Sequence, residues 1–258
     1  MTQDTTSQGL KGHIIMVTGG GRGIGRIVAH RLASEGARIV ILGRHKGRLE
    51  QTRKELLLTG AEALAIVTEL SDLTSIQEAV AKTVEHFGGL DAIVHNAGVA
   101  HWGPVSLDNL TQLDAMLNVN MRAPYVLTAA ALPWLRKSSR GAIVFISSLA
   151  AKENGMHSAM YCATRRGMAA FAENLFDEVR GDGIKVMTLF PSFVTPPKMP
   201  DANAQFVEDR VLDAGDVATA VHFGLTLPPG VCPIEIVLRV QKDPWVMDTK
   251  RSDKGETY

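Results

Sequence analysis

Short apolar runs alternate with longer amphipathic segments along most of the chain. Seven of these runs are rich in Ile, Val, Leu and Ala and are nearly continuous in their apolar character. They occupy residues 14–17, 38–42, 63–67, 90–94, 142–146, 185–189 and 234–238. Continuous apolar runs of this length are typical of strands buried on both faces, as in a parallel sheet.

The segments between these runs carry apolar residues at helical spacing. Helices are expected over residues 24–35, 46–58, 73–87, 108–136, 158–180 and 215–227. Asp72 is expected to cap the third of them at its N-terminus, and Gly88-Gly89 to end it.

Strands that alternate with helices imply right-handed crossovers between parallel strands. We therefore expect an α/β fold, a doubly wound, seven-stranded parallel sheet with helices on both faces, which is the Rossmann fold. One domain is expected over residues 1–258, with a flexible leader at 1–10 and a polar tail at 241–258. The tail is either disordered or packed on a partner subunit, and the sequence leaves both open.

Residues 191–214 interrupt the alternation because they contain prolines at positions 191, 196, 197 and 200. A short helix is expected around residues 203–212. Loops at the carboxyl ends of parallel strands line the ligand site in sheets of this class, so this segment is a candidate lid over a substrate.

The overall charge excludes some classes of protein. Lys and Arg total 27, as do Asp and Glu, so nothing attracts the chain as a whole to nucleic acid or to an anionic membrane. No apolar run is long enough to span a bilayer, and the N-terminus lacks a signal-peptide pattern. Two cysteines are too few for a disulfide framework. These features favour a cytoplasmic protein, and no residue group has the spacing of zinc ligands.

A glycine-rich turn follows the first expected strand and opens the first helix. Glycines let the backbone turn tightly and approach a pyrophosphate, which the free N–H groups of a helix N-terminus attract. The candidate cofactor residues in this turn are Gly19, Gly21, Arg22, Gly23, Ile24 and Gly25.

The second expected strand ends in Gly43-Arg44 and lacks the acidic residue that would bind both hydroxyls of an adenine ribose. Arg44 can instead pair with a 2′-phosphate through its forked donors, and Arg22 can add a second contact. The cofactor predicted from these residues is NADP(H).

Tyr161 and Arg165 lie four residues apart in the fifth expected helix, so they share one helix face. A cation beneath the phenol would stabilise the phenolate and let the tyrosine exchange a proton. Ser148 follows the fifth expected strand, and its hydroxyl could polarise a carbonyl group.

These motifs resemble those of the short-chain dehydrogenase/reductase family over about residues 11–240. The glycine turn matches TGxxxGxG, and Tyr161 with Arg165 matches YxxxK except that arginine replaces lysine. His95-Asn96-Ala97-Gly98 resembles NNAG, with histidine in the first place. Residues 191–195 resemble PGxxxT, with Ser192 in place of glycine.

The resemblance implies a role for each matching residue. Tyr161 would be the acid or base, Ser148 would polarise the carbonyl, and Arg165 would also bind the nicotinamide ribose. Asn120 would hold a relay water through its backbone carbonyl, and Asn118 is the less favoured choice for this role. The remaining cofactor contacts implied are Glu69, Leu70, Asn96, Ala97, Gly98, Pro191, Val194 and Thr195.

The expected function is an NADP(H)-dependent oxidoreductase that interconverts a ketone or aldehyde with its alcohol. The expected substrate wall is mostly apolar, with Trp102 as an aromatic face, and favours a medium-sized apolar or aromatic compound. It comprises residues 99–104, Leu149, Met156, His157 and Phe193. Since Arg165, Ser192 and His95 depart from the family patterns, the alternative is a cofactor-binding protein with little turnover, acting as a sensor or assembly subunit. His95 is interpreted as a core residue.

A homodimer or homotetramer is expected, because two long helical segments carry apolar residues on more than one face and family members commonly pair through these helices. The residues are Leu113, Met116, Leu117, Leu127, Leu132, Trp134, Met168, Phe171, Leu175 and Phe176.

Overall fold

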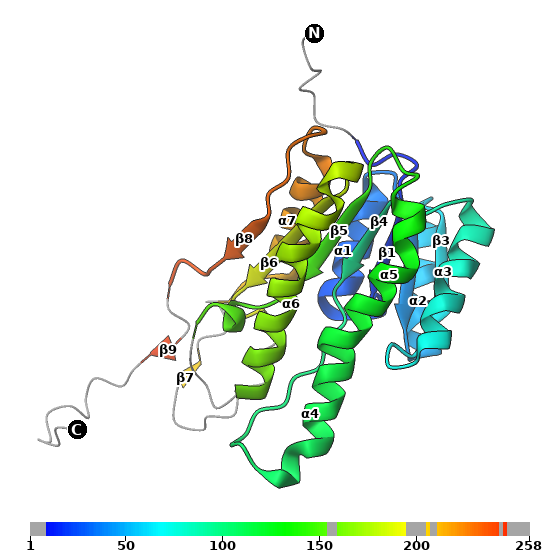
Figure 1. The fold of residues 1–258 in the computed structure, drawn as a ribbon. Coiled ribbons are helices and arrows are strands. Elements are labelled where there is room, and N and C mark those ends of the chain that lie inside the picture. Colours follow the sequence, from blue (N-terminus) through cyan, green and yellow to red (C-terminus); the bar gives the residue numbers. More distant parts are fainter. Residues whose placement is uncertain (1–8, 154–158, 195–204, 207–210, 243–244, 247–258) are drawn as a thin grey trace, which may run out of the picture.

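The computed structural model describes residues 9–153, 159–194, 205–206, 211–242 and 245–246. Its centre is a seven-stranded parallel sheet in the order β3-β2-β1-β4-β5-β6-β8 (Figure 1). The strands are β1 (Ile14–Thr18), β2 (Arg38–Gly43), β3 (Ala63–Val67), β4 (Ala92–His95), β5 (Ala142–Ile146), β6 (Lys185–Pro191) and β8 (Glu235–Leu238). All seven expected strands are present, although β4 starts two residues later than predicted and includes His95.

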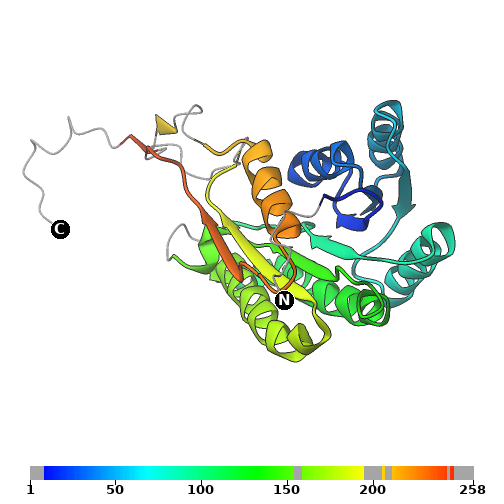
Figure 2. The same cartoon turned by 90° about the horizontal axis from the view of Figure 1, so that it is seen from above.

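Helices cover both faces of the sheet, as Figure 2 shows from above. One face is covered by α1 (Gly23–Ser34), α2 (Lys46–Leu58) and α7 (Ala214–Thr226). The other is covered by α3 (Leu73–Phe87), α5 (Ala123–Leu135) and α6 (Ala159–Val179). The predicted doubly wound fold is therefore confirmed.

The apolar runs explain why two cores form. Successive side chains of a strand point to opposite faces, so Ile15 and Val17 of β1 pack into one core and Ile14 and Met16 into the other. Every residue of β1 is buried. A strand with alternating polarity could not fill both layers, which is why the runs are continuous.

The predicted signals that bound α3 are confirmed. The Asp72 carboxylate accepts hydrogen bonds from the backbone N–H groups of Thr74, at 3.1 Å, and Ser75, at 3.2 Å. Gly88 ends the helix in the left-handed region, with φ of 84°, a conformation that favours glycine.

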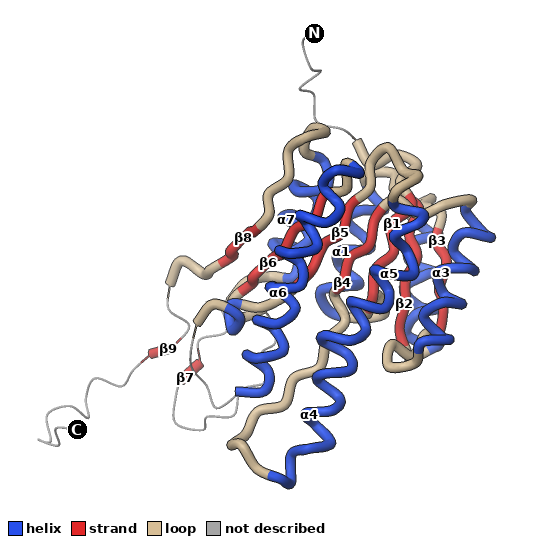
Figure 3. The backbone as a smooth tube through the Cα atoms, viewed as in Figure 1, coloured by secondary structure: helices blue, strands red, loops and turns tan. Residues whose placement is uncertain are grey.

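The helical stretch predicted over residues 108–136 is not one regular helix. It begins with a single 3₁₀ turn, η1 (Leu107–Asn109), and α4 (Leu110–Leu117) follows. A π-helical turn, η2 (Asn118–Arg122), then joins α4 to α5 (Figure 3). The other short turns are η3 (Leu149–Ala151) and η4 (Arg180–Asp182).

The short helix predicted around residues 203–212 is wrong where the structure describes it. Gln205–Phe206 form the strand β7, which pairs antiparallel with β9 (Trp245–Val246). Leu212 pairs with Val194 in an isolated bridge. Residues 245 and 246 of the tail therefore pair with their own chain, which neither sequence alternative anticipated. Residues 203–204, 207–210, 243–244 and 247–258 of these two segments lie outside the described residues.

Several apolar residues that suggested an oligomer are buried within the chain itself. Met116, Leu127, Met168 and Leu175 are at most 3% exposed, because their helices pack on the sheet and on one another. The apolar residues that α4 and α5 expose most are Leu110, Leu117 and Tyr125. In the described part of the chain, no helix is long and apolar enough to cross a membrane.

Candidate active site

The sheet reverses its order between β1 and β4, and the crevice at the carboxyl ends of these strands is the expected ligand site of such a fold. The glycine-rich turn starts here. Gly19 and Gly23 adopt positive φ angles of 70° and 52°, which disfavour residues with a side chain. A methyl group on Gly20 would lie 2.5 Å from Cγ2 of Ile41, so this glycine is required by packing against β2.

The ends of β1 and β4 are tied together by Thr18. Its hydroxyl accepts hydrogen bonds from the backbone N–H groups of Asn96, at 3.0 Å, and Ala97, at 2.9 Å. The Asn96 side chain in turn donates to the Thr18 carbonyl at 2.8 Å. The side chain also fills the space beside Gly25, where a methyl group would overlap its amide nitrogen. Asn96 thus holds the two strand ends beside the first turn of α1.

Two cations flank the mouth of this crevice. Arg22 lies in the glycine-rich turn and Arg44 follows the end of β2, and both side chains are exposed. Since Thr18 and Leu42 are paired residues of neighbouring strands, the two loops leave the sheet side by side. A methyl group on Gly21 would lie 3.3 Å from Cβ of Arg48 at the start of α2. Arg48, which the sequence analysis missed, therefore adds a third positive charge at this edge.

The loop after β3 carries two of the expected cofactor contacts, Glu69 and Leu70. Glu69 bonds within its own loop, because its Oε1 accepts from the backbone N–H of Ser71 at 3.1 Å and from its hydroxyl at 2.8 Å. Leu70 is buried in the core below α3. The adjacent backbone carbonyl of Ser71 accepts a bond from Arg122 at 2.8 Å.

Tyr161 and Arg165 lie on one face of α6, as their spacing predicts. The guanidinium carbon of Arg165 is 5.1 Å from the centroid of the Tyr161 ring, which is a cation–π contact. Arg165 is only 6% exposed. Its Nη1 donates to the Ile146 carbonyl at 3.3 Å, so the end of β5 holds the charged group beneath the phenol.

Gly98 makes room for the guanidinium. A methyl group there would overlap Nη2 of Arg165, so the arginine is packed against bare backbone. The Nε of Arg165 is buried and has no hydrogen-bond partner within the described residues. A buried, unsatisfied donor is costly, and this one lies between the ends of β4 and β5 at the candidate site.

Asn120 is fully buried in the π-helical turn, and all of its side-chain bonds face inward. Its Oδ1 accepts from the Val99 N–H at 2.9 Å, and its Nδ2 donates to the Val99 carbonyl at 2.8 Å. The same Nδ2 donates to the Thr164 hydroxyl at 3.1 Å, and that hydroxyl donates to the Tyr161 carbonyl at 2.9 Å. A chain of bonds therefore joins the loop after β4 to the helix that carries Tyr161.

The two serines after β5 point to different partners, as alternation along a strand predicts. Ser147 is buried and donates to the Arg165 carbonyl at 3.2 Å. Ser148 is half-buried and its hydroxyl oxygen accepts from the Ala150 N–H at 3.2 Å. This bond engages one lone pair of the Ser148 hydroxyl and leaves its O–H able to donate.

His95 is a core residue, as interpreted from the sequence. Its ring stacks on that of Phe145 with centroids 4.7 Å apart, and its Nε2 lies 3.0 Å from the Thr128 hydroxyl. Complete burial lowers the pKa of His95 to about 3. The histidine is therefore neutral under physiological conditions and contributes no charge to the site.

Some predicted site residues are only partly described. Pro191 is buried at the end of β6, and Val194 lies in the bridge to Leu212. Ser192 places a buried hydroxyl oxygen there, which has no partner among the described residues. Thr195, Met156 and His157 lie outside the described residues.

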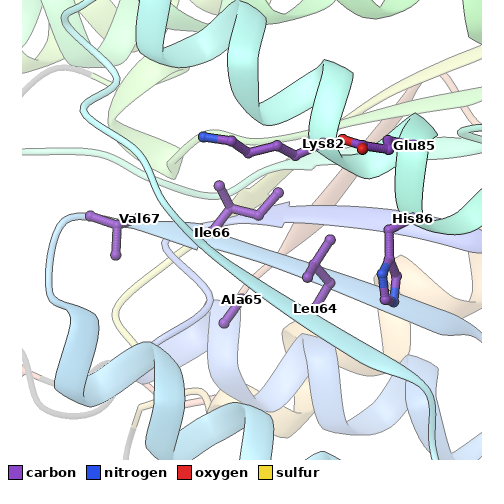
Figure 4. Close-up of a pocket in the computed structure, with 7 residues that line it drawn as sticks. All are labelled: Leu64, Ala65, Ile66, Val67, Lys82, Glu85 and His86. Carbon is purple, nitrogen blue, oxygen red and sulfur yellow. The ribbon is translucent and has the colours of Figure 1, made fainter.

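A surface hollow of about 610 Å³ lies elsewhere, at the outer edge of β3 (Figure 4). Its lining residues are Leu64, Ala65, Ile66, Val67, Lys82, Glu85 and His86. β3 is separated from β5 by three strands of the sheet, so the hollow takes no part in the chemistry around Tyr161.

Comparison with known proteins agrees with this geometry. A family model described as short chain dehydrogenase matches residues 13–206. An uncharacterised oxidoreductase of Staphylococcus epidermidis is 32% identical over 230 residues, which cover 89% of this chain and 98% of the relative.

Solved structures give the same picture. A metagenomic short-chain oxidoreductase in complex with NADP is 29% identical with a TM-score of 0.79, and the match covers 90% of this chain and 99% of that one. An alcohol dehydrogenase from the archaeon Thermococcus sibiricus, complexed with 5-hydroxy-NADP, is 25% identical with a TM-score of 0.79 and matches 90% of this chain and 97% of its own. The chain therefore belongs to the short-chain dehydrogenase/reductase family of oxidoreductases.

Proposed function

We propose that this protein uses NADP(H) to interconvert a ketone or aldehyde with its alcohol. The observation that carries the proposal is the buried Arg165 guanidinium against the ring of Tyr161, next to the crevice at the end of β4. A phenol beside a fixed positive charge is suited to exchanging a proton with a substrate oxygen.

The residues of the crevice fit a phosphorylated dinucleotide. The glycine-rich turn leaves backbone free of side chains at the N-terminus of α1, where phosphate groups are stabilised. Arg22, Arg44 and Arg48 supply positive charge where β1 and β2 end, and no acidic side chain follows β2 directly. The Nε of Arg165 and the hydroxyl of Ser192 are buried and have no partner in the described part of the chain, and a ligand would provide one for each.

Each catalytic role follows from the position of a side chain. When bound, the nicotinamide would supply or accept the hydride. In the reducing direction Tyr161 would give its phenolic proton to the carbonyl oxygen, and Arg165 would stabilise the phenolate that is left. Ser148 would donate a hydrogen bond to the same oxygen as negative charge develops on it. The Ser148 oxygen already accepts from Ala150, so its O–H remains the group that can donate.

Asn120 has a different part in this scheme. Its side chain is committed to Val99 and Thr164, so only its backbone carbonyl could hold a water in a proton relay from Tyr161. π-helical turns are frequent at functional sites, and this one lies directly beside α6.

The test has two measurements. Dissociation constants for NADPH and NADH are measured by titration calorimetry, and NADPH consumption is followed by absorbance with a panel of ketones and aldehydes. We expect tighter binding of NADPH and its consumption with part of the panel. Equal affinities for the two cofactors, or tighter binding of NADH, would contradict the assignment of NADP(H) as the cofactor. Tight binding without consumption across the panel would favour a cofactor-binding protein with little turnover.

Arg44 provides the sharper version of the cofactor test. Arg44→Ala should weaken NADPH binding about tenfold, because a charge-assisted contact to phosphate is lost, and should leave NADH binding unchanged. Lys54→Ala is the matched control, since it removes an exposed cation further along α2. A similar loss in the control would mean that net charge alone drives the binding.

A further inference from the structure

Trp102 lies against the candidate catalytic tyrosine. The centroids of the Trp102 and Tyr161 rings are 5.4 Å apart, and the ring planes are inclined by 48°. The Tyr161 ring therefore contacts the indole as well as the Arg165 guanidinium, whose carbon lies 5.1 Å from the same centroid. Trp102 is only half-buried, so part of the indole beside Tyr161 is accessible to a ligand.

The loop that carries Trp102 is fixed on both sides of the indole. The side-chain amide of Asn109 contacts the loop through both its oxygen and its nitrogen. Its Oδ1 lies 3.2 Å from Nε2 of His101, and its Nδ2 donates to the Pro104 carbonyl at 2.9 Å. Val99, at the start of the loop, is held through both of its backbone groups by Asn120. Trp102 is thus presented from a loop tied down before and after it.

A rigid indole in this place distinguishes substrates by shape. Aromatic rings gain from offset or tilted packing on one another beyond the burial of their area, and saturated rings lack this gain. A carbonyl carbon whose oxygen reaches Tyr161 must place its substituents near the indole. A flat substituent conjugated to the carbonyl can lie against this surface, whereas a puckered ring of equal size makes fewer contacts.

We propose that Trp102 is a specificity-determining residue that favours carbonyl compounds with a planar aromatic ring attached to the carbonyl, and that Asn109 is the residue that positions it. The inference rests on the proposed function and deepens it, since it names the substrate class of the same site.

The test compares acetophenone with cyclohexyl methyl ketone, which have the same carbon skeleton and differ in the planarity of one ring. The quantity measured is kcat/KM for acetophenone divided by kcat/KM for the cyclohexyl ketone. This ratio is compared between variants, so that the different intrinsic reactivities of the two ketones cancel. Trp102→Leu should lower the aromatic preference about five- to tenfold, which corresponds to the packing gain of an aromatic pair, and mainly through KM. Trp102→Phe should keep most of the preference. An unchanged ratio in Trp102→Leu would overturn the inference.

Asn109 is tested by a second variant. Asn109→Ala should lower the same ratio about two- to fivefold while the dissociation constant for NADPH stays constant, because Asn109 acts only through the loop. Asn174→Ala is the matched control, an exposed asparagine on α6 whose amide donates to the Ala170 carbonyl of its own helix. A fall in the ratio in both Asn109→Ala and Asn174→Ala, or in neither of them, would exclude a positioning role for Asn109.

A binding measurement separates this inference from the proposed function. Titration calorimetry with saturating NADP⁺, which cannot reduce a ketone, should give a lower dissociation constant for acetophenone than for the cyclohexyl ketone, and Trp102→Leu should remove this difference. Preferential binding of acetophenone without NADPH consumption would overturn the proposed reaction and support the aromatic site. Consumption of NADPH with equal affinities for both ketones would support the reaction and overturn the aromatic site.

Discussion

The size of the side chain at position 165 governs how the candidate tyrosine can work. Arginine and lysine carry the same charge, but a guanidinium is planar, wider and never gives up its proton. Here both Nη atoms are committed, one to the Ile146 carbonyl and the other to packing on Gly98. The guanidinium therefore leaves less room for water beneath Tyr161 than the ammonium of a lysine would.

Arg165→Lys should raise kcat about tenfold, equivalent to about 1.4 kcal/mol of barrier, because a shorter ammonium restores room for a proton relay below the phenol. NADPH affinity should be retained, since the positive charge stays. Steady-state kinetics at saturating NADPH measures the effect. Arg166→Lys, the next arginine of α6, which bonds to the Ala151 carbonyl, should leave kcat unchanged. A rate that stays equal or falls in the Arg165 variant would show that the pocket has adapted to arginine.

Two buried histidines should make the protein sensitive to mild acid. Burial, followed by the nearby Arg140, lowers the pKa of His13 to about 4, and burial alone lowers that of His95 to about 3. Both pKa values are depressed in the folded state, so between pH 6.5 and 4 the unfolded chain binds more protons than the folded one. Stability is therefore complete above pH 6.5 and is lost as the pH falls below it.

Urea unfolding at pH 7.5 and pH 5.5 measures this loss, which we expect to be about 1 kcal/mol for each histidine. His13→Gln should remove about half of the difference between the two pH values. His86→Gln replaces an exposed histidine of α3 and serves as the control that leaves the difference intact. A pH dependence that is the same in all three proteins would contradict the assignment to buried histidines.

At the scale of elements, the regular part of the fold could be predicted because each strand fills two cores. In a chain with amphipathic helices on either side of it, a continuous apolar run such as that of β1 indicates a strand buried on both faces. The π-helical turn could not be predicted, since its residues 118–122 read as ordinary helix and differ only in their bonding. β7 and β9 are two residues each and depend on pairing across some 40 positions, so they leave no periodic signal.

Asn120 stabilises this turn and the loop beside it. Asn120→Ala leaves the backbone N–H and carbonyl of the half-buried Val99 without their partners, which should cost about 1–3 kcal/mol of stability and lower kcat by loosening Tyr161 through Thr164. Thermal unfolding and kinetics measure both effects. Asn118→Ala, in the same turn but half-buried, should change neither by a comparable amount. Larger losses of stability and of kcat in Asn118→Ala than in Asn120→Ala would assign the role to Asn118.

At the scale of the whole molecule, the candidate site could be predicted as far as short motifs describe it. The glycine-rich turn, Asn96, Ser148 and Tyr161 occupy places in chain order that a motif can record. The contacts that shape the pocket could not be predicted, because they join residues far apart in the chain. Trp102 on Tyr161 and Gly98 beneath Arg165 depend on how the loop after β4 meets helix α6, and no spacing encodes that.

The exposed apolar side chains of α4 and α5 bear on assembly. Tyr125 is 60% exposed, and Leu110 and Leu117 are 50% and 42% exposed. We expect a homodimer or homotetramer that buries them, since an apolar helix face beyond the one on the sheet needs a partner. Sedimentation at micromolar concentration should give a multiple of the chain mass, and Tyr125→Glu should shift it toward the monomer.

Leu58→Glu is the matched control for this prediction, because Leu58 is 87% exposed at the far end of α2. It should leave the assembly intact. A monomer in the unmodified protein would mean that these residues stay exposed or are covered by the chain's own C-terminal segment.

The contact between Arg165 and Gly98 also restricts the order in which this protein can evolve. While arginine occupies position 165, a methyl group at 98 would overlap its Nη2, so alanine there would force the guanidinium to shift. A change to lysine at 165 would remove that atom and open position 98 to other small residues. A descendant lineage could then accept a small side chain at 98, and a later return to arginine at 165 would require the guanidinium to take a different position from the one it has here.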